Sequence, residues 1–522
     1  MSKYKKITYI ILIITLIVIG TSLALWIRIR EQNGKNEVAS TCISLEIDRN
    51  TEGDAITMDD AFPLTDIDGL KEKRYTFTIV NGCSSYIFYN INLESLTSVA
   101  EEERIPIEYI KAIIDNNPPI TLNNYDEVNS LLSSGTAYDT RMLDNGILYG
   151  NESRTFNLKL WLDEDTPKDY MEHAYEAKVT VYGELMKIDY GPVNAVTYLT
   201  NKVSTDNDLV YDDAIDTENE ANNNIRYVGA NPNNYVWFND ELWRIIGVMK
   251  GVNGSSTDDG SGETRIKIIR DESLGRFPYS ESCLNENMVN NGDGTYTCNN
   301  LFYNNNWPSS TVNKILNDLY WNRETHISFN GYMYVNNTWQ DYKTEIIDFR
   351  LNGLKKTAQN LIEPAMYYLG GYTITSSDQY YYGRMDSKKW YEAERNNRSS
   401  NNELTWTGNL GLMYPSDFGY ASSEVVSNNR CNNIALNAWG NEGNSLCRAN
   451  DWISLGKWHQ WTITSRIDHN SDVVNVSASN LIDHRWDSTR YAFDIRPVAY
   501  LKSNVKIYKG VGTEEDPYRL AI

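Results

Sequence analysis

Three of the five histidines lie close together in the sequence, and two of them end the same tripeptide. Ile-Asp-His occurs at 467–469 and again at 482–484, after His459. An aspartate beside an imidazole can orient the ring for metal binding or proton transfer, so His459, His469 and His484 form the candidate enzyme site. The simpler interpretation, which we favour, is exposed turns with solvated side chains. We therefore predict no metal site.

Other catalytic motifs are missing from the sequence. It contains no Gly-x-Ser-x-Gly, no His-Glu-x-x-His and no glycine loop for phosphate. Close carboxylates, such as Asp163 with Asp165, are typical of turns rather than of glycosidic acid/base chemistry. We predict a protein without catalytic residues or cofactors.

Aromatic residues are the stronger signal, and they indicate ligand binding. Exposed aromatic rings stack on sugars or peptides and lose little entropy in doing so. The same rings are also common in protein cores, and that alternative stays open. The candidate ligand-binding residues are Trp452, Trp458, Trp461, Trp486, Tyr380 and Tyr381.

The six cysteines form three close pairs in the sequence, namely Cys42 with Cys83, Cys283 with Cys298, and Cys431 with Cys447. An even and locally paired set is typical of disulfides formed in an oxidising compartment. We predict three disulfides. The first is expected to tie neighbouring strands, and the second to close a short hairpin.

An uncharged apolar run precedes all of these cysteines. It comprises the twenty residues from Ile7 to Trp26, and a helix of that length spans roughly 30 Å, the thickness of a bilayer's hydrocarbon core. We predict a cytoplasmic tail (1–6), a membrane anchor (7–27) and an extracellular C-terminal bulk. The flanking basic residues nearly balance, so the cysteines decide the orientation. A cleaved signal peptide is the alternative, because Ser-Leu-Ala near the end of the run is a small-x-small pattern.

The net charge argues against nucleic acid as a partner. The 522 residues carry a formal charge of −22, whereas phosphate binding needs Lys and Arg clustered on one face. Hydrophobic residues make up 41 % of the chain, which is enough for substantial cores. We therefore predict folded domains, and the sequence leaves their oligomeric state open.

Apolar and polar residues alternate through much of 41–188. Tyr75, Phe77 and Ile79 alternate with threonines, and the same period recurs at 87–93. Strict alternation indicates strands with one buried and one exposed face. Several such strands in this length predict an antiparallel, immunoglobulin-like β-sandwich.

Residues 189–224 have a different composition. Their second half, TDNDLVYDDAIDTENEANNN (205–224), is acidic and rich in Asn, with few core-forming residues. This composition predicts a linker between domains. A calcium loop is not supported here, because the glycine and terminal glutamate of such a loop are missing.

The C-terminal part combines short strands, two helices and long loops. YVWF (235–238) and WRIIGV (243–248) flank an Asn-Asp turn, which predicts a hairpin. Helices are predicted at 311–321 and at 354–369, where Pro364 bends or interrupts the second one. The predicted fold class is an N-terminal transmembrane helix, then an all-β sandwich, then an α+β domain.

The C-terminal part also resembles a group of uncharacterised bacterial surface proteins. Their C-terminal domain is similar to the C-type-lectin-like fold shared with formylglycine-generating enzymes, and the resemblance covers roughly 225–522. It implies that the α+β domain is C-type-lectin-like. The resemblance rests on WRIIGV (243–248), IIRDESLG (268–275), GLMYPSDFGY (411–420) and DIRPVAYLK (494–502).

The residues that give these relatives their chemistry do not match. Formylglycine-generating enzymes bind copper with a close cysteine pair near the C-terminus, whereas Cys431 and Cys447 are sixteen residues apart. Sugar-binding C-type lectins bind calcium through Glu-Pro-Asn or Gln-Pro-Asp, whereas this chain has Glu-Pro-Ala at 363–365. The resemblance therefore implies a fold without either activity.

The sequence thus predicts a single-pass surface protein that binds an extracellular glycan or protein through 225–522, as in adhesion. One alternative is a surface-fibre or matrix component that assembles through edge strands of the sandwich. An enzyme with the His/Asp site is the other. We also predict a structural ion pair between Asp494 and Arg496, because a buried guanidinium needs a carboxylate partner.

Overall fold

The computed structural model divides the chain into two compact units, residues 1–188 (unit 1) and residues 189–522 (unit 2). Each unit is described by itself. The structure describes residues 30–31, 37–38, 42–47, 56–58, 61–115, 117–185, 192–254, 261–280, 288–290, 296–298, 304–326, 330–335, 338–343, 347–397, 403–485 and 491–522.

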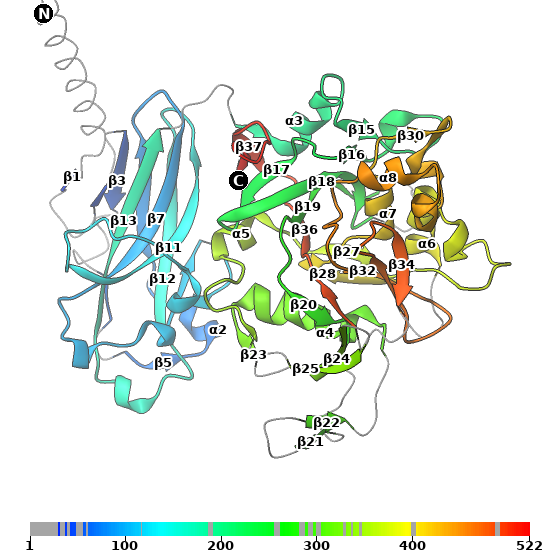
Figure 1. Cartoon of the computed structure of the whole chain (residues 1–522). Helices are drawn as coiled ribbons and strands as arrows, with labels where there is room; N and C mark the ends of the chain where they lie inside the picture. Colours follow the sequence, from blue (N-terminus) through cyan, green and yellow to red (C-terminus); the bar gives the residue numbers. More distant parts are fainter. Residues whose placement is uncertain are drawn as a thin grey trace, which may run out of the picture. The chain divides into compact units, whose positions relative to one another are not determined.

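Unit 1 consists of two β-sheets (Figure 1). The first has the order β1 (Arg30–Glu31), β2 (Glu37–Val38), β13 (Tyr175–Leu185), β7 (Ile87–Leu96), β11 (Ala137–Leu148) and β10 (Asp126–Glu127), with β4 (Ile56–Met58) also paired to β13. The second has the order β3 (Ile43–Ile47), β6 (Tyr75–Asn81), β12 (Ser153–Asp163), β8 (Ile110–Ile114) and β9 (Ile120–Thr121), with β5 (Pro63–Leu64) on β12. The helical segments are short: α2 (Asp66–Gly69), η1 (Glu101–Glu103), η2 (Ile107–Tyr109), η3 (Leu122–Asn124) and η4 (Lys168–Tyr170).

The alternation predicted for unit 1 is confirmed by side-chain burial. In β6, Phe77 and Ile79 are fully buried, and the residues between them are partly exposed. In β7, Ile87, Tyr89 and Ile91 are fully buried as well. These side chains belong to one core cluster that draws on both sheets. The β-rich architecture of unit 1 therefore fits the immunoglobulin-like expectation.

The disulfide predicted between Cys42 and Cys83 is present, with a Cα–Cα distance of 5.2 Å. Cys42 precedes β3 and Cys83 follows β6, and these strands are neighbours because Ile43 pairs with Asn81. The bridge thus ties neighbouring strands, as predicted. The predicted pair of Cys283 and Cys298 lies outside the residues whose side chains the structure describes.

Unit 2 contains a large sheet that carries most of its long strands (Figure 1). Its order is β14 (Val193–Asn194), β37 (Lys506–Lys509), β38 (Tyr518–Ala521), β17 (Tyr235–Phe238), β18 (Glu241–Val252), β19 (Glu263–Arg270), β36 (Val498–Tyr500) and β29 (Leu410–Gly411). Two further strands join at β18: β16 (Ile225–Tyr227) pairs with β18, and β15 (Leu209–Tyr211) pairs with β16. The predicted hairpin is confirmed, because β17 and β18 pair around Asn239 and Asp240, both in the left-handed region.

A second sheet and several hairpins complete the strands of unit 2. The second sheet has the order β20 (Arg276–Pro278), β35 (Ala492–Asp494), β32 (Gln460–Ser465), β33 (Val473–Val476) and β34 (Ile482–Arg485). The hairpins are β21 (Met288–Asn290) with β22 (Tyr296–Cys298), β23 (Thr325–His326) with β26 (Ile347–Asp348), β24 (Asn330–Val335) with β25 (Thr338–Lys343), β27 (Ala365–Tyr368) with β28 (Thr405–Gly408), and β30 (Val425–Val426) with β31 (Asn429–Arg430).

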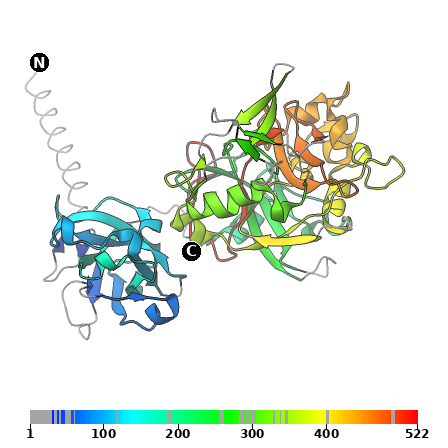
Figure 2. The ribbon, with the colours of Figure 1, turned by 90° about the horizontal axis from the view of Figure 1, so that it is seen from below.

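The helical segments of unit 2 are short and cluster in part on one side of it. The segments α6, α7, η11 and α8 lie near the strands β33 and β34 (Figures 1 and 2). The bounds are α3 (Ala195–Lys202), η5 (Glu220–Asn222), η7 (Trp307–Ser309), α4 (Thr311–Lys314), the π-helical η8 (Ile315–Tyr320), α5 (Lys356–Leu361), η9 (Tyr382–Arg384), α6 (Ser387–Asn396), α7 (Pro415–Gly419), η10 (Cys431–Asn433), η11 (Leu436–Gly440) and α8 (Ser445–Ala449).

The predicted fold class is wrong. The described chain is mostly β-sheet, and its longest α-helix, α6, has ten residues. The helix predicted at 354–369 ends at Leu361 and is followed by β27, because Pro364 lacks an N–H and disfavours helical backbone before it. The transmembrane helix is also not supported: none of the helices in the described part of the chain is long and apolar enough to cross a bilayer, and residues 7–27 lie outside that part.

Residues 192–224, within the segment predicted to be a linker, are part of unit 2. β14 pairs with β37, and α3 buries Ala195 and Leu199 in the core of this unit. The acidic residues that indicated a linker lie mostly at the surface of this segment. A few buried apolar residues are enough to hold its backbone on the sheet.

Candidate functional site

A row of residues crosses four neighbouring strands of the large sheet in unit 2. Arg226 of β16 pairs with Gly247 of β18, Gly247 pairs with Lys267 of β19, and Lys267 pairs with Tyr500 of β36. Glycine is required in this row, because a Cβ at position 247 would lie 2.0 Å from the carbonyl oxygen of Ile225. Paired residues point to the same face of a sheet, so the strand order brings two cations and a tyrosine together.

The segments α6, α7 and β27 supply the side chains that face this row. Tyr391 and Arg395 lie one turn apart on α6 and therefore share a face of the helix. Asp417 lies in the first turn of α7, where its carboxylate accepts a hydrogen bond of 2.9 Å from the backbone N–H of Tyr414. This bond fixes the carboxylate at the start of the helix. β27 contributes Tyr368.

Together these elements form a small cleft with a volume of about 30 Å³. Basic side chains outnumber acidic ones in its lining, since four basic residues face a single aspartate. Four tyrosines and a few apolar side chains complete it. The lining includes Arg226, Lys250, Lys267, Arg395, Asp417, Tyr368, Tyr391, Tyr414, Tyr500, Met249, Val252 and Met366.

Asp417 is the centre of a buried ion-pair network in the cleft. Its Oδ1 lies 2.6 Å from Nη1 of Arg226, and its Oδ2 lies 2.5 Å from Nζ of Lys267. Arg226 also donates from Nε to Asp212 at 2.9 Å. The side chains of all four residues are at most 3 % exposed. Because one aspartate binds residues from two different strands, the network holds α7 against the sheet.

Burial and mutual charge shift the pKa values in this network. Burial lowers the pKa of Lys267 to about 8, although the nearby carboxylate of Asp417 favours the charged ammonium. For Asp417, burial alone would raise the pKa, but the charges of Lys267 and Arg226 outweigh burial and hold the pKa below its ordinary value. The aspartate is therefore ionised near neutral pH, while the lysine is close to its own titration.

Glu394 lies on α6 beside the cleft, and the pKa of its carboxyl is raised, whereas that of Asp417 is lowered. Burial raises the pKa of its carboxyl to about 7, despite the nearby charge of Arg395. Its two oxygens accept hydrogen bonds from the backbone N–H of Ser416 at 2.9 Å and from the hydroxyl of Ser416 at 2.6 Å. A carboxyl that is half protonated near neutral pH balances a neighbouring cation only in part.

Arg395 and Tyr414 keep donors available in the cleft. The guanidinium of Arg395 lies over the ring of Tyr391, 3.3 Å from its centroid. Its Nη1 donates to the carbonyl of Tyr391 and to Glu394, and within the described residues its other nitrogens have no acceptor. The Tyr414 hydroxyl accepts from the N–H of Tyr368 at 2.7 Å, so its own proton stays available for donation.

The arrangement is suited to binding an anionic or polar group. Lys267, Arg395 and Tyr414 present donors from a sheet and a helical layer that are held together by buried ion pairs. Buried charged donors give strong and directional hydrogen bonds. Among the described side chains, no group of three or more His, Cys, Asp or Glu has the geometry of a metal site.

The aromatic residues predicted to bind ligand do not form one surface. Trp452 and Trp461 are buried, and their indole N–H groups donate to the carbonyls of Tyr227 and Phe277. Trp458 is 54 % exposed. Tyr380 and Tyr381 are partly buried, away from the residues that line the cleft, and Trp486 lies outside the described residues.

The three histidines of the candidate enzyme site contact different neighbours. His459 lies 2.8 Å from Oδ1 of Asn475, and His469 lies 2.8 Å from the hydroxyl of Ser471. His484 packs against the ring of Tyr382, with the ring centroids 4.6 Å apart. His459 directly precedes β32, His469 lies in the loop after β32, and His484 lies in β34.

Asp494 and Arg496 make other contacts than the predicted ion pair. The guanidinium of Arg496 donates to the carbonyls of Arg270 and Ile453, at 2.7 and 2.5 Å. Among the described residues, no salt bridge joins Arg496 to Asp494. Backbone carbonyls can satisfy a buried guanidinium, an option that the sequence pattern does not reveal.

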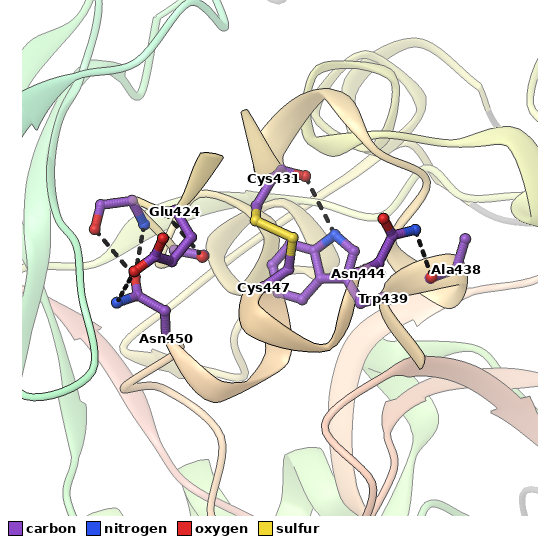
Figure 3. Close-up of a disulfide and its surroundings, with 9 residues drawn as sticks. Glu424, Cys431, Ala438, Trp439, Asn444, Cys447 and Asn450 are labelled. Atoms are coloured by element: carbon purple, nitrogen blue, oxygen red, sulfur yellow. Dashed lines mark hydrogen bonds between the residues drawn. A yellow bond between two sulfur atoms is a disulfide. The ribbon is translucent and has the colours of Figure 1, made fainter. Parts of the chain in front are cut away.

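The disulfide predicted between Cys431 and Cys447 is present, and the Trp439 side chain lies beside it (Figure 3). Both cysteines are fully buried, and Trp439 donates from its indole N–H to the carbonyl of Cys431 at 3.2 Å. The Trp439 ring packs on Phe418 of α7, with centroids 4.9 Å apart. The bridge therefore supports the helix that carries Asp417.

Comparison with known proteins adds no family. No protein-family model and no curated protein matches this chain. The resemblance of 225–522 to uncharacterised bacterial surface proteins therefore stays a prediction.

The cleft was not predicted from the sequence, although two of the segments that carry the resemblance contribute to it. GLMYPSDFGY (411–420) supplies Tyr414 and Asp417, and DIRPVAYLK (494–502) supplies Tyr500. A usable signal was the position of Lys267 in the apolar strand RIKIIR, because a lysine that is buried needs a partner.

Proposed function

We propose that this chain is an extracytoplasmic, non-catalytic binding protein that captures a glycan or a protein ligand through unit 2, as an adhesin does. The observation that carries the proposal is the cleft, in which donors from Lys267, Arg395 and Tyr414 face a common space. Tyrosine and arginine contribute strongly to binding sites, because they combine apolar contact area with hydrogen bonding.

Two disulfides support a location outside the cytoplasm. The Cys42–Cys83 and Cys431–Cys447 bridges belong to different units, so each unit carries its own cross-link. Such bonds persist in oxidising environments and are rare in a reducing cytosol. Each cross-link also constrains the unfolded chain, which suits a domain that works without chaperones at a cell surface.

Unit 1 has the features of a spacer in this proposal. We take it as an immunoglobulin-like sandwich with a continuous core and no part in the cleft. Its edge strands β9 and β10 have two residues each, whereas the edge strand β3 has five. Very short edge strands offer few hydrogen-bonding groups to another chain, so fibre assembly would have to use β3.

A binding screen tests the proposal. The purified full chain is applied to arrays of neutral and acidic glycans and to extracellular proteins, beside the variant Tyr391→Ala, which removes a ring of the cleft. Binding signals of the wild type that disappear in Tyr391→Ala would support ligand binding at the cleft, provided that the near-UV circular dichroism of the variant is unchanged. Signals that are equal for both proteins would place binding elsewhere and contradict the proposal.

A further inference from the structure

The cleft concentrates positive charge in a chain that is acidic overall. The chain carries a formal charge of −22, yet four basic residues line the cleft and only Asp417 has the opposite sign. Overall composition does not explain a basic cavity, so its charge requires a local cause.

Internal ion pairs balance only part of this charge. Asp212 and Asp417 neutralise Arg226 and Lys267. Arg395 has a carboxylate oxygen of Glu394 at 3.4 Å, and that carboxyl is itself half protonated near neutral pH. Lys250 adds a further positive charge, since its Nζ donates to the carbonyl of Ala221 and not to a described carboxylate. The cleft therefore keeps an excess of between about one and two positive charges.

The donors of the cleft also exceed its acceptors. Lys267 donates only to Asp417 among the described residues, and Arg395 uses a single nitrogen, Nη1. An ammonium has three N–H groups and a guanidinium has five. Because unsatisfied buried donors cost free energy, this geometry favours an acceptor inside the cavity.

We propose that the cleft binds the carboxylate of an acidic sugar, with Arg395 and Lys267 donating to its oxygens. This inference rests on the binding function proposed above and names the ligand class. A carboxylate carries one negative charge, which lies within this excess, and it presents two oxygens, whereas a phosphate group presents three strong acceptor oxygens and needs more space. The volume of about 30 Å³ holds about two water molecules, whose places the two carboxylate oxygens take.

The remaining lining suits the rest of a sugar. Met366 is partly exposed and offers apolar contact beside the charged groups, whereas Met249, Val252, Tyr368 and Tyr391 are at most 9 % exposed and only line the space around the carboxylate. Aromatic and apolar side chains pack against the C–H faces of a sugar ring and keep the carboxylate oriented. A free small acid would use the cations but not these contacts.

Isothermal titration calorimetry of the full chain tests the inference. D-glucuronate is the probe, D-glucose is its neutral counterpart, and acetate and inorganic phosphate separate the carboxylate from the sugar and from other anions. We expect glucuronate to bind, acetate to bind at least about tenfold more weakly, and glucose and phosphate to give no heat. Equal binding of phosphate or of glucose would overturn the inference.

Variants of one helix assign the effect to the cleft. Arg395→Gln is expected to weaken glucuronate binding about tenfold or more, since a hydrogen bond to a charged group is lost. Arg395→Lys keeps the positive charge but loses the planar guanidinium. Its affinity for glucuronate is expected to lie between those of the wild type and Arg395→Gln. Lys389→Gln removes the same charge from an exposed position of α6 and is expected to bind like the wild type.

Three results would count against the inference in different ways. Equal losses in Arg395→Gln and Lys389→Gln would show that only overall charge matters. Full binding by Arg395→Gln, with circular dichroism like the wild type, would place the carboxylate elsewhere. If no acid binds while neutral glycans bind at the cleft in the screen above, the carboxylate inference fails and the binding function stands.

Discussion

Glu394→Gln removes a carboxyl group whose ionisation destabilises unit 2. Glu394 is fully buried, and burial raises the pKa of its carboxyl from 4.5 to about 7. A glutamine has the same volume, and its amide oxygen can still accept the hydrogen bond from the N–H of Ser416. The variant therefore changes the titration and leaves the packing of α6 in place.

The sign of the effect follows from proton binding. The unfolded chain releases this proton near pH 4.5, whereas the folded protein releases it near pH 7. Between these values the folded state binds more protons, so the free energy of unfolding falls as pH rises. The difference between the two pKa values corresponds to about 3 kcal/mol in the free energy of unfolding. This stabilisation is present below pH 4.5 and is lost once the pH has risen above 7.

Urea denaturation of the full chain at about pH 5 and about pH 8 measures this loss. We expect the free energy of unfolding of Glu394→Gln, relative to the wild type, to rise by about 2 to 3 kcal/mol between the two conditions. Other titrating groups cancel in this difference. Glu392→Gln, a partly exposed position on the same helix, should show no such rise. If Glu394→Gln and the wild type change in parallel, Glu394 does not titrate in this range and the reasoning is refuted.

Three further predictions concern the cleft and its support. Affinity for glucuronate should fall about tenfold or more between about pH 6.5 and pH 9 in calorimetry, because Lys267, with a pKa of about 8, loses its charge and Glu394, with a pKa of about 7, becomes ionised beside Arg395; a constant affinity would exclude both contributions. Gly247→Ala should lower the free energy of unfolding by about 1 to 3 kcal/mol, since its Cβ would lie 2.0 Å from a carbonyl oxygen. An unchanged midpoint of urea denaturation would contradict the close approach of the backbone at this position. In the double variant Cys431→Ser, Cys447→Ser, the free energy of unfolding should fall by about 3 kcal/mol, and glucuronate should bind more weakly. Wild-type affinity in this variant would show that α7 needs no support from the disulfide.

The alternation of apolar and polar residues correctly predicted the strands at 75–79 and 87–93 of unit 1. Phe77 and Ile79 were expected on a buried face from their alternation with threonine, and both are fully buried. The pattern worked because each sheet has one face in the core and one face outside, so a polar residue at every second position carries information. The Cys42–Cys83 bridge followed from the same reading, because the cysteines flank strands that pair.

The spacing of apolar residues gave wrong predictions where contacts between residues distant in the sequence decide the structure. The helix expected at 354–369 was read from apolar spacing, but Pro364 and the pairing of β27 with β28 turned its second half into a strand. Arg496 was expected to pair with Asp494 because a buried guanidinium needs a carboxylate partner, yet its partners are the carbonyls of residues 270 and 453. In both cases the deciding partner is distant in the chain.

The cleft shows most clearly why a functional site can escape a sequence pattern. In RIKIIR, Lys267 shares a strand face with Arg265, and such a face is normally read as exposed to water. It is buried because a second layer, α6 and α7, covers that face with Arg395 and Asp417. The lysine at position 267 and the aspartate at 417 each look ordinary alone, and only their contact across 150 residues makes them a site.

That contact also explains why the site is both buried and charged. A buried Lys267 without Asp417 would cost several kcal/mol, and the same holds for the aspartate without its two cations. Replacing the whole network with apolar residues would be at least as stable, so stability alone does not account for it. A network that keeps charged donors aimed at a cavity, at a cost to stability, is better explained by the ligand that those donors hold.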